Sequence, residues 1–140
     1  MRNISFHFIN TRKIVFDRTS VKLWIKEIIE NESGKAGKIS INFCNDEYIL
    51  EINKEYLQHD YYTDIITFNY NDDNRISGDL LISLDRIREN TTLYNERFKR
   101  ELYRVIFHGV LHLIGYDDKD AVSEKIMRSK EDFYLSKFSV

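Results

Sequence analysis

The chain has 140 residues, of which 42% are hydrophobic and 14% aromatic, and its 21 basic and 23 acidic side chains leave a net charge of -2. This composition excludes intrinsic disorder, and the near balance of charge gives no global sign of nucleic-acid binding. The single cysteine, Cys44, excludes an intramolecular disulfide and a zinc site built from several cysteines. Any metal must therefore be bound by nitrogen and oxygen ligands.

The length fits one domain, residues 1–140, with one hydrophobic core. No stretch approaches the roughly 20 apolar residues of a membrane span. The first residues lack the basic-then-apolar order of a secretory signal. We therefore expect one cytoplasmic domain that has no membrane partner.

In the first third of the chain, the apolar spacing alternates between strand and helix periods. Apolar residues at every second position predict a strand over Ile4–Phe8, with His7 facing away from the apolar side. Between Val21 and Ile29 the spacing becomes that of a helix. Residues 34–37 are predicted as a turn, and alternation over Ile39–Phe43 predicts a second strand.

The middle of the chain predicts one more helix and two strands. Asn45 is placed to cap a helix. Residues 64–70 and 79–84 then predict two strands separated by the polar run 71–75. Because only a loop joins these two strands, they can pair antiparallel, whereas the earlier strands alternate with helices and favour parallel pairing.

Helices dominate the last third. One is predicted to begin at residues 85–90, a longer one runs from about Glu96 to Ile114 and stops at Gly115, and a third covers about 122–138. The expected fold is a single α+β domain. Its sheet is mixed, mainly parallel and four-stranded, and helices pack on it.

The long helix carries an unusual pair of histidines. Its residues 102–114 are apolar nearly all round, apart from Arg104, His108 and His112, which indicates a helix buried on most sides. Residues four apart lie one turn above each other, so both imidazoles point the same way and can bind one metal ion. Two histidines at this spacing are also common as ordinary core or surface residues.

A glycine after the two histidines adds a third candidate ligand to the pattern. Gly115 ends the helix and lets the chain turn back, which brings Asp117 or Asp118 toward the same ion. Three protein ligands with one open position are typical of a catalytic metal site.

The full spacing resembles that of the metzincin zinc peptidases, H-E-x-x-H-x-x-G-x-x-H, so we expect a zincin-like histidine helix. Two positions differ. Gly109 stands where those peptidases place the glutamate that acts as general base, and Asp118 stands where they place the third histidine. The peptidase mechanism has therefore lost its proton acceptor.

A closer resemblance is to the YbeY family, bacterial single-domain endoribonucleases that mature and check ribosomal RNA. Residues 108–118 match every position but the last of its hallmark, H-G-x-L-H-L-x-G-Y-D-H. Residues 63–68 are similar to its T-D-V-L-S-F strand and residues 78–83 to its G-D-I-x-I-S strand. Met127 and Glu131 fit its last helix. The resemblance covers most of the chain beyond the first 50 residues.

This resemblance implies a single-strand-specific, metal-dependent endoribonuclease that matures the 3′ end of 16S ribosomal RNA and takes part in ribosome quality control. The implied cofactor is one zinc ion bound by His108, His112 and, in place of the third histidine, Asp118. Because a carboxylate is a harder, anionic donor than an imidazole, the identity of the metal stays open. The implied partners are single-stranded RNA, ribosomal RNA and the ribosome or its proteins, and no DNA is expected.

The catalytic residues implied for this chain depart from the family at one point. The family arginine of N-x-x-Y-R aligns with Leu57, so its role does not transfer, and His59 nearby is a candidate to take part instead. A lone loop histidine is also common as plain surface. Arg104, one turn before His108, can neutralise a phosphate, or it can pair with a nearby acid such as Glu101. The catalytic set is thus the two helix histidines, Arg104 and His59.

Several polar and aromatic residues have two interpretations. Asp64 and Asp79 flank apolar strands and can orient ligand histidines, although plain solvation of strand ends is the preferred interpretation. Tyr61, Tyr62 and Tyr70 can stack on bases or pack at the rim of the core. The basic residues of the 86–104 stretch are interleaved with acids, so RNA binding is implied by the resemblance and not by charge.

Three functions remain open at this point. A metal-dependent endoribonuclease acting on ribosomal RNA leads. A non-catalytic ribosome-assembly or RNA-binding factor gains weight from Leu57 and Asp118, which replace two family residues tied to chemistry and metal. A zinc peptidase is disfavoured by Gly109.

Overall fold

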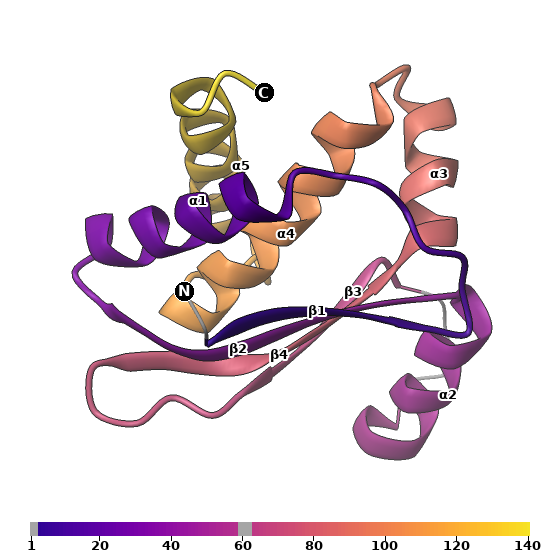
Figure 1. Cartoon of the computed structure of the whole chain (residues 1–140), viewed down its shortest axis with the longest axis horizontal. Helices are drawn as coiled ribbons and strands as arrows, with labels where there is room; N and C mark the ends of the chain where they lie inside the picture. Colours follow the sequence, from indigo (N-terminus) through magenta and orange to yellow (C-terminus); the bar gives the residue numbers. More distant parts are fainter. Residues whose placement is uncertain (1–2, 59–62) are drawn as a thin grey trace.

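The computed structural model describes residues 3–58 and 63–140. It contains one four-stranded sheet, in the order β1-β2-β4-β3 (Figure 1). The strands are β1 (Ile4–Ile9), β2 (Lys35–Cys44), β3 (Ile65–Asn69) and β4 (Arg75–Ser83). β1 pairs with β2 and β2 with β4 in parallel, whereas β3 pairs with β4 antiparallel. The expected mixed, mainly parallel sheet is confirmed.

The helices of the described residues are divided unequally between the two faces of this sheet. They are α1 (Arg18–Asn31), α2 (Asp46–Leu57), α3 (Leu84–Leu93), α4 (Phe98–Ile114) and α5 (Ala121–Lys137). Figure 1 shows α1, α3, α4 and α5 above one face and α2 alone against the other. The α+β class expected from the sequence is therefore confirmed.

The alternation of side chains along each strand decides which face is core. In β2, Ile41 and Phe43 are fully buried in the main core, and the intervening Ser40 and Asn42 point to the other face and are half-buried. Among the helices of the described residues, α2 is the one that packs on that other face. There it buries a small cluster: Cys44, Ile49, Ile66 and Leu81.

Two strands begin before the first residue that the alternating apolar pattern predicted for them. β2 begins at Lys35, so the predicted turn over residues 34–37 is wrong after Gly34. β4 begins at Arg75, which shortens the predicted loop by one residue. The two polar strand ends pair with each other, and a backbone hydrogen bond of 2.9 Å runs from Lys35 N–H to the Asn74 carbonyl. A strand ladder joins backbone groups, so it can extend beyond the apolar pattern that reveals the strand.

The helix that carries the histidines lies very close to the sheet. A Cβ atom added at Gly109 would lie 2.6 Å from Cδ1 of Ile65 and 2.9 Å from Cδ1 of Leu80. The absence of a side chain at Gly109 therefore lets α4 pack closely on β3 and β4. Among residues 3–58 and 63–140, no helix combines the length and apolar character needed to cross a membrane.

Candidate metal centre

The candidate centre begins where α4 ends. Gly115 has φ of 128°, a backbone conformation that residues with a side chain rarely adopt. The Gly115 and Tyr116 N–H groups both donate to the Leu111 carbonyl, at 3.1 and 3.0 Å, which closes the last turn. The chain then reverses direction, as the sequence predicted, and passes back over the helix.

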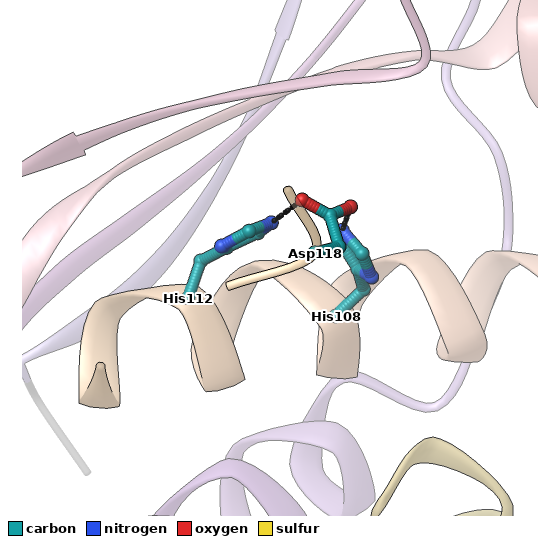
Figure 2. Close-up of side chains that lie close together, drawn as sticks. All are labelled: His108, His112 and Asp118. Carbon is teal, nitrogen blue, oxygen red and sulfur yellow. Dashed lines mark ion pairs between the residues drawn. The ribbon is translucent and has the colours of Figure 1, made fainter. Parts of the chain in front are cut away.

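This reversal places Asp118 over both histidines (Figure 2). Asp118 Oδ2 lies 3.4 Å from His108 Nε2, and Asp118 Oδ1 lies 3.6 Å from His112 Nε2. One ligand atom from each of the three residues lies within 4.8 Å of the other two. Of the two aspartates that the helix-ending glycine left open, Asp118, the one that the resemblance implied, faces the histidines.

The outward nitrogen of each imidazole has its own hydrogen-bond acceptor. His108 Nδ1 lies 2.6 Å from Glu131 Oε2, and His112 Nδ1 lies 2.9 Å from the carbonyl oxygen of Tyr116. An ionised carboxylate and a carbonyl only accept, so we assign the Nδ1 hydrogen to both rings. In the neutral rings, both Nε2 lone pairs then point toward Asp118, the arrangement in which imidazoles bind a metal.

The two histidines have opposite pKa shifts. Burial alone would lower the pKa of His108, but the hydrogen bond and charge of Glu131, with Asp64 and Asp118, leave it raised. The pKa of His112 is lowered, first by burial and then by the charge of His108. Since a metal ligand must be deprotonated, a cation at this place competes with protons at His108.

The donor types of the three residues fit a zinc-type cation. Tetrahedral ligands at about 2.0–2.2 Å from zinc stand about 3.4 Å from one another. The 3.4 and 3.6 Å distances join the two imidazoles to different oxygens of Asp118, and one ligand atom from each residue lies within 4.8 Å of the others, so a bound cation would draw the ligands together. The donors are two imidazole nitrogens and a carboxylate. The Asp118 side chain is 41% exposed, so the centre opens to solvent on one side. Three protein ligands and an open side are the pattern of a catalytic site.

Arg104 lies behind His108 and not over the open side. Its guanidinium donates to Glu131 Oε1 at 3.0 Å and to Asp132 Oδ1 at 2.7 Å, and its side chain is 8% exposed. Glu131 therefore bridges Arg104 and His108. This geometry fits the ion-pair alternative for Arg104, with Glu131 and Asp132 as partners in place of the suggested Glu101.

Asp64 and Asp79 lie in different surroundings. Burial raises the pKa of Asp64, and the nearby charge of His108 partly offsets this, so Asp64 belongs to the neighbourhood of the centre. Asp79 accepts a hydrogen bond from the Ser40 hydroxyl on the face that α4 does not cover. There it lines a cavity of about 500 Å³ together with Tyr70, whose side chain is 58% exposed.

Three residues singled out in the sequence, His59, Tyr61 and Tyr62, lie outside the described residues. The other predicted residues have contacts away from the centre. Leu57, at the end of α2, is 40% exposed. In the basic stretch, Arg86 pairs with Asp46 at 2.9 Å, Arg88 with Asp85 at 3.8 Å and Arg100 with Glu96 at 3.6 Å. These pairs are typical of an ordinary charged surface.

Sequence reasoning missed the two acceptors that orient the histidines. Glu131 was placed in the last helix by the resemblance, but nothing in its spacing connects it with His108, 23 residues away. The Tyr116 carbonyl is a backbone group, so its residue type carries no signal. Its position four residues after His112, across the helix-ending glycine, was the only available clue.

Comparisons with known proteins show the family to which the chain is similar. The family model described as Endoribonuclease YbeY matches residues 7–139. A protein named Endoribonuclease YbeY from Parabacteroides distasonis is 50% identical over 119 residues, which cover 85% of this chain and 84% of the relative. A protein of the same name from Flavobacterium psychrophilum is 46% identical over 124 residues, 89% of each chain.

A solved structure extends the likeness to three dimensions. The solution structure of TM1509 from Thermotoga maritima superimposes with a TM-score of 0.68 and is 26% identical in sequence. The alignment covers 96% of this chain and 88% of the Thermotoga protein. The order and packing of the elements are therefore shared over nearly the whole chain.

Proposed function

The chain belongs to the YbeY family of endoribonucleases, and we propose that it hydrolyses single-stranded RNA with a zinc ion bound by His108, His112 and Asp118. The observation that carries this proposal is the convergence of these three side chains at the open side of α4. The proposed physiological reaction is maturation of the 3′ end of 16S ribosomal RNA in the cytoplasm, together with ribosome quality control. The proposed partners are ribosomal RNA and the ribosome or its proteins.

Some of these residues would bind the metal ion, and others orient the side chains that bind it. A zinc ion bound here would supply Lewis-acid stabilisation of the scissile phosphate and would lower the pKa of a bound water. His108 and His112 present Nε2 to it, while Glu131 and the Tyr116 carbonyl hold the Nδ1 hydrogens and prevent the rings from turning. The partly exposed Asp118 leaves the side from which RNA can approach.

His59 keeps its predicted role as a proposal, whereas the proposed role of Arg104 differs from the phosphate neutralisation expected from the sequence. His59 is proposed to take part in catalysis in place of the family arginine, and His59→Ala tests this through the rate of cleavage. Arg104 is proposed to act on the reaction through Glu131, because its guanidinium binds that carboxylate and not the open side. Unchanged turnover of His59→Ala would dispose of the first role.

Metal analysis and RNA cleavage together test the proposal. The purified wild type should contain stoichiometric metal and cleave a single-stranded oligonucleotide from the 3′ end of 16S RNA but not its duplex. His112→Ala and Asp118→Ala should lose both properties. Asp117→Ala is the matched control, because Asp117 is an exposed neighbouring acid outside the three ligands. Stoichiometric metal that survives both ligand changes would refute the proposed site.

A second function is favoured by two residues of this chain. Leu57 and Asp118 replace an arginine and a histidine that the resemblance ties to chemistry and to metal. Metal binding without any cleavage would favour a non-catalytic ribosome-assembly factor that binds RNA. A zinc peptidase is opposed by Gly109, since this position offers no proton acceptor and lies against Ile65 and Leu80.

A further inference from the structure

The two histidines are oriented in physically different ways. His108 donates to the side chain of Glu131, which Arg104 holds from behind. His112 donates to a backbone carbonyl, that of Tyr116, in the segment that follows α4. The orientation of His112 therefore depends on where this segment, residues 115–118, is held.

Besides the backbone hydrogen bonds to the Leu111 carbonyl that close α4, the segment is held by the side chain of Tyr116. Residues 117–120 are exposed, whereas Tyr116 is partly buried and packs against the main core. The Tyr116 hydroxyl donates to Glu32 Oε1 at 2.6 Å. Lys130 Nζ lies 5.6 Å from the centre of the Tyr116 ring and 3.2 Å from Glu32 Oε2, so it contacts both partners.

Glu32 is well placed to serve as a fixed point. It follows directly on the last residue of α1, its side chain is 10% exposed, and its N–H donates to the Ile28 carbonyl. Its second carboxylate oxygen also accepts a hydrogen bond from the Tyr134 hydroxyl of α5. The carboxylate is thus anchored to α1 and α5 independently of the segment that it holds.

We propose that Glu32 is a positioning residue for the metal centre and acts through Tyr116. By fixing the Tyr116 ring, Glu32 places the carbonyl that orients His112 and the backbone that returns Asp118 to the histidines. This inference rests on the proposed metal-dependent function. It assigns a role in the centre to a residue 80 positions before His112 in the sequence.

Two substitutions test whether Glu32 and Tyr116 position His112, and a third substitution is the matched control. Tyr116→Phe and Glu32→Ala should lower zinc affinity about tenfold, the lower end of what loss of an outer partner of a metal ligand costs. Tyr134→Phe also removes a hydroxyl from Glu32, but it leaves Tyr116 in place, so its zinc affinity should stay within about twofold of the wild type. Zinc affinity is measured by competition with a chromogenic chelator, and unfolding by urea is followed in parallel.

The control separates positioning from general stability. Tyr134 is fully buried and Tyr116 is not, so Tyr134→Phe should destabilise the fold at least as much. If zinc affinity followed stability, Tyr134→Phe would lower it as much as Tyr116→Phe, and this result would overturn the inference. Wild-type affinity in both Tyr116→Phe and Glu32→Ala would overturn it as well.

A measurement without metal keeps this test independent of the proposed function. Nitrogen-15 NMR of the metal-free protein reports which ring nitrogen of His112 carries hydrogen. We expect the Nδ1–H form in the wild type and in Tyr134→Phe, and a mixture of forms in Tyr116→Phe. If the wild type binds no metal, the proposed function fails, and the NMR comparison still decides whether Glu32 and Tyr116 position His112.

Discussion

At the scale of single residues, Asp118 determines the charge and the donor type of the candidate ligand set. Two neutral imidazoles and one carboxylate bring a net negative charge to the ion, whereas three imidazoles bring none. The carboxylate is also a harder donor, which improves binding of metals such as manganese relative to zinc. We therefore expect an aspartate in place of a histidine at this position to change which metal is preferred, whereas loss of the carboxylate should abolish binding.

We expect Asp118→His to retain zinc binding and to lower the affinity for manganese relative to zinc. The reason is the replacement of a hard anionic oxygen by a softer neutral nitrogen at an otherwise unchanged centre. Competition titrations of both metals measure the ratio of the two affinities, with His112→Ala as the variant that should bind neither well. An unchanged ratio would show that Asp118 is not a ligand.

Arg104 carries a buried charge, and its ion-pair partners compensate the cost of burying it. Its side chain is 8% exposed, and it forms ion pairs with Glu131 and Asp132. Arg104→Met should lower the free energy of unfolding by about 3 kcal/mol, because it leaves the buried Glu131 carboxylate uncompensated.

The control for this change is Asp132→Asn, which removes the other carboxylate. The Asp132 side chain is 55% exposed, so water replaces the lost interaction and the expected loss is below about 1 kcal/mol. Urea unfolding measures both changes. Equal losses would contradict the assignment of Glu131 as the buried partner.

At the scale of elements, Glu32 joins α1, α5 and the segment after α4. Burial alone would raise the pKa of Glu32, but hydrogen bonds from Tyr116 and Tyr134 and the contact with Lys130 leave it below its ordinary value of 4.5. A carboxyl with a lowered pKa in the folded state stabilises the fold above its unfolded pKa. That contribution is lost as the pH falls through the lowered value.

This linkage predicts how Glu32→Gln changes the pH dependence of stability. Above about pH 5.5 the variant should be less stable than the wild type by a constant amount, since Glu32 is ionised in both states there. Below pH 4.5 the difference should shrink as the pH falls. Thermal or urea unfolding between pH 3 and pH 7 measures the difference, and one that grows toward low pH would contradict the direction of the shift.

At the scale of the whole molecule, one core connects nearly all the elements. Residues from β1, β2, β4 and from α1, α3, α4 and α5 contribute to the same main cluster. The candidate metal centre lies on the element with the most buried residues, α4, so we expect metal binding there to be coupled to the stability of the entire fold.

We expect the chain to unfold as one domain in a single transition whose midpoint rises with zinc. Free zinc at 100 times its dissociation constant should add about 2.7 kcal/mol of stability, which corresponds to a shift of roughly 5–10 °C for a chain of this size. Calorimetry checks both points. His112→Ala should show no such shift, and two separate transitions in the wild type would contradict the single domain.

The sequence by itself determined the elements and the outline of the centre. Local patterns were sufficient because each depends on near neighbours: the 3.6-residue period of α4, the spacing of His108 and His112, and the glycine that reverses the chain. The directions of strand pairing also followed from the short loop between β3 and β4 and the helices between the other strands, whereas the position of β4 between β2 and β3 was not predicted.

Only the tertiary structure decided which distant groups surround the histidines. Glu131 of α5 binds His108, Arg104 of α4 binds Glu131, and Glu32 at the end of α1 binds Tyr116, and these contacts depend on how the helices pack. The resemblance had already implied Asp118 and not Asp117 as the third ligand, and the path of the chain after Gly115 places its carboxylate beside both histidines. The contacts between helices, in contrast, arise from the packing of whole elements, so no local spacing in the sequence encodes them.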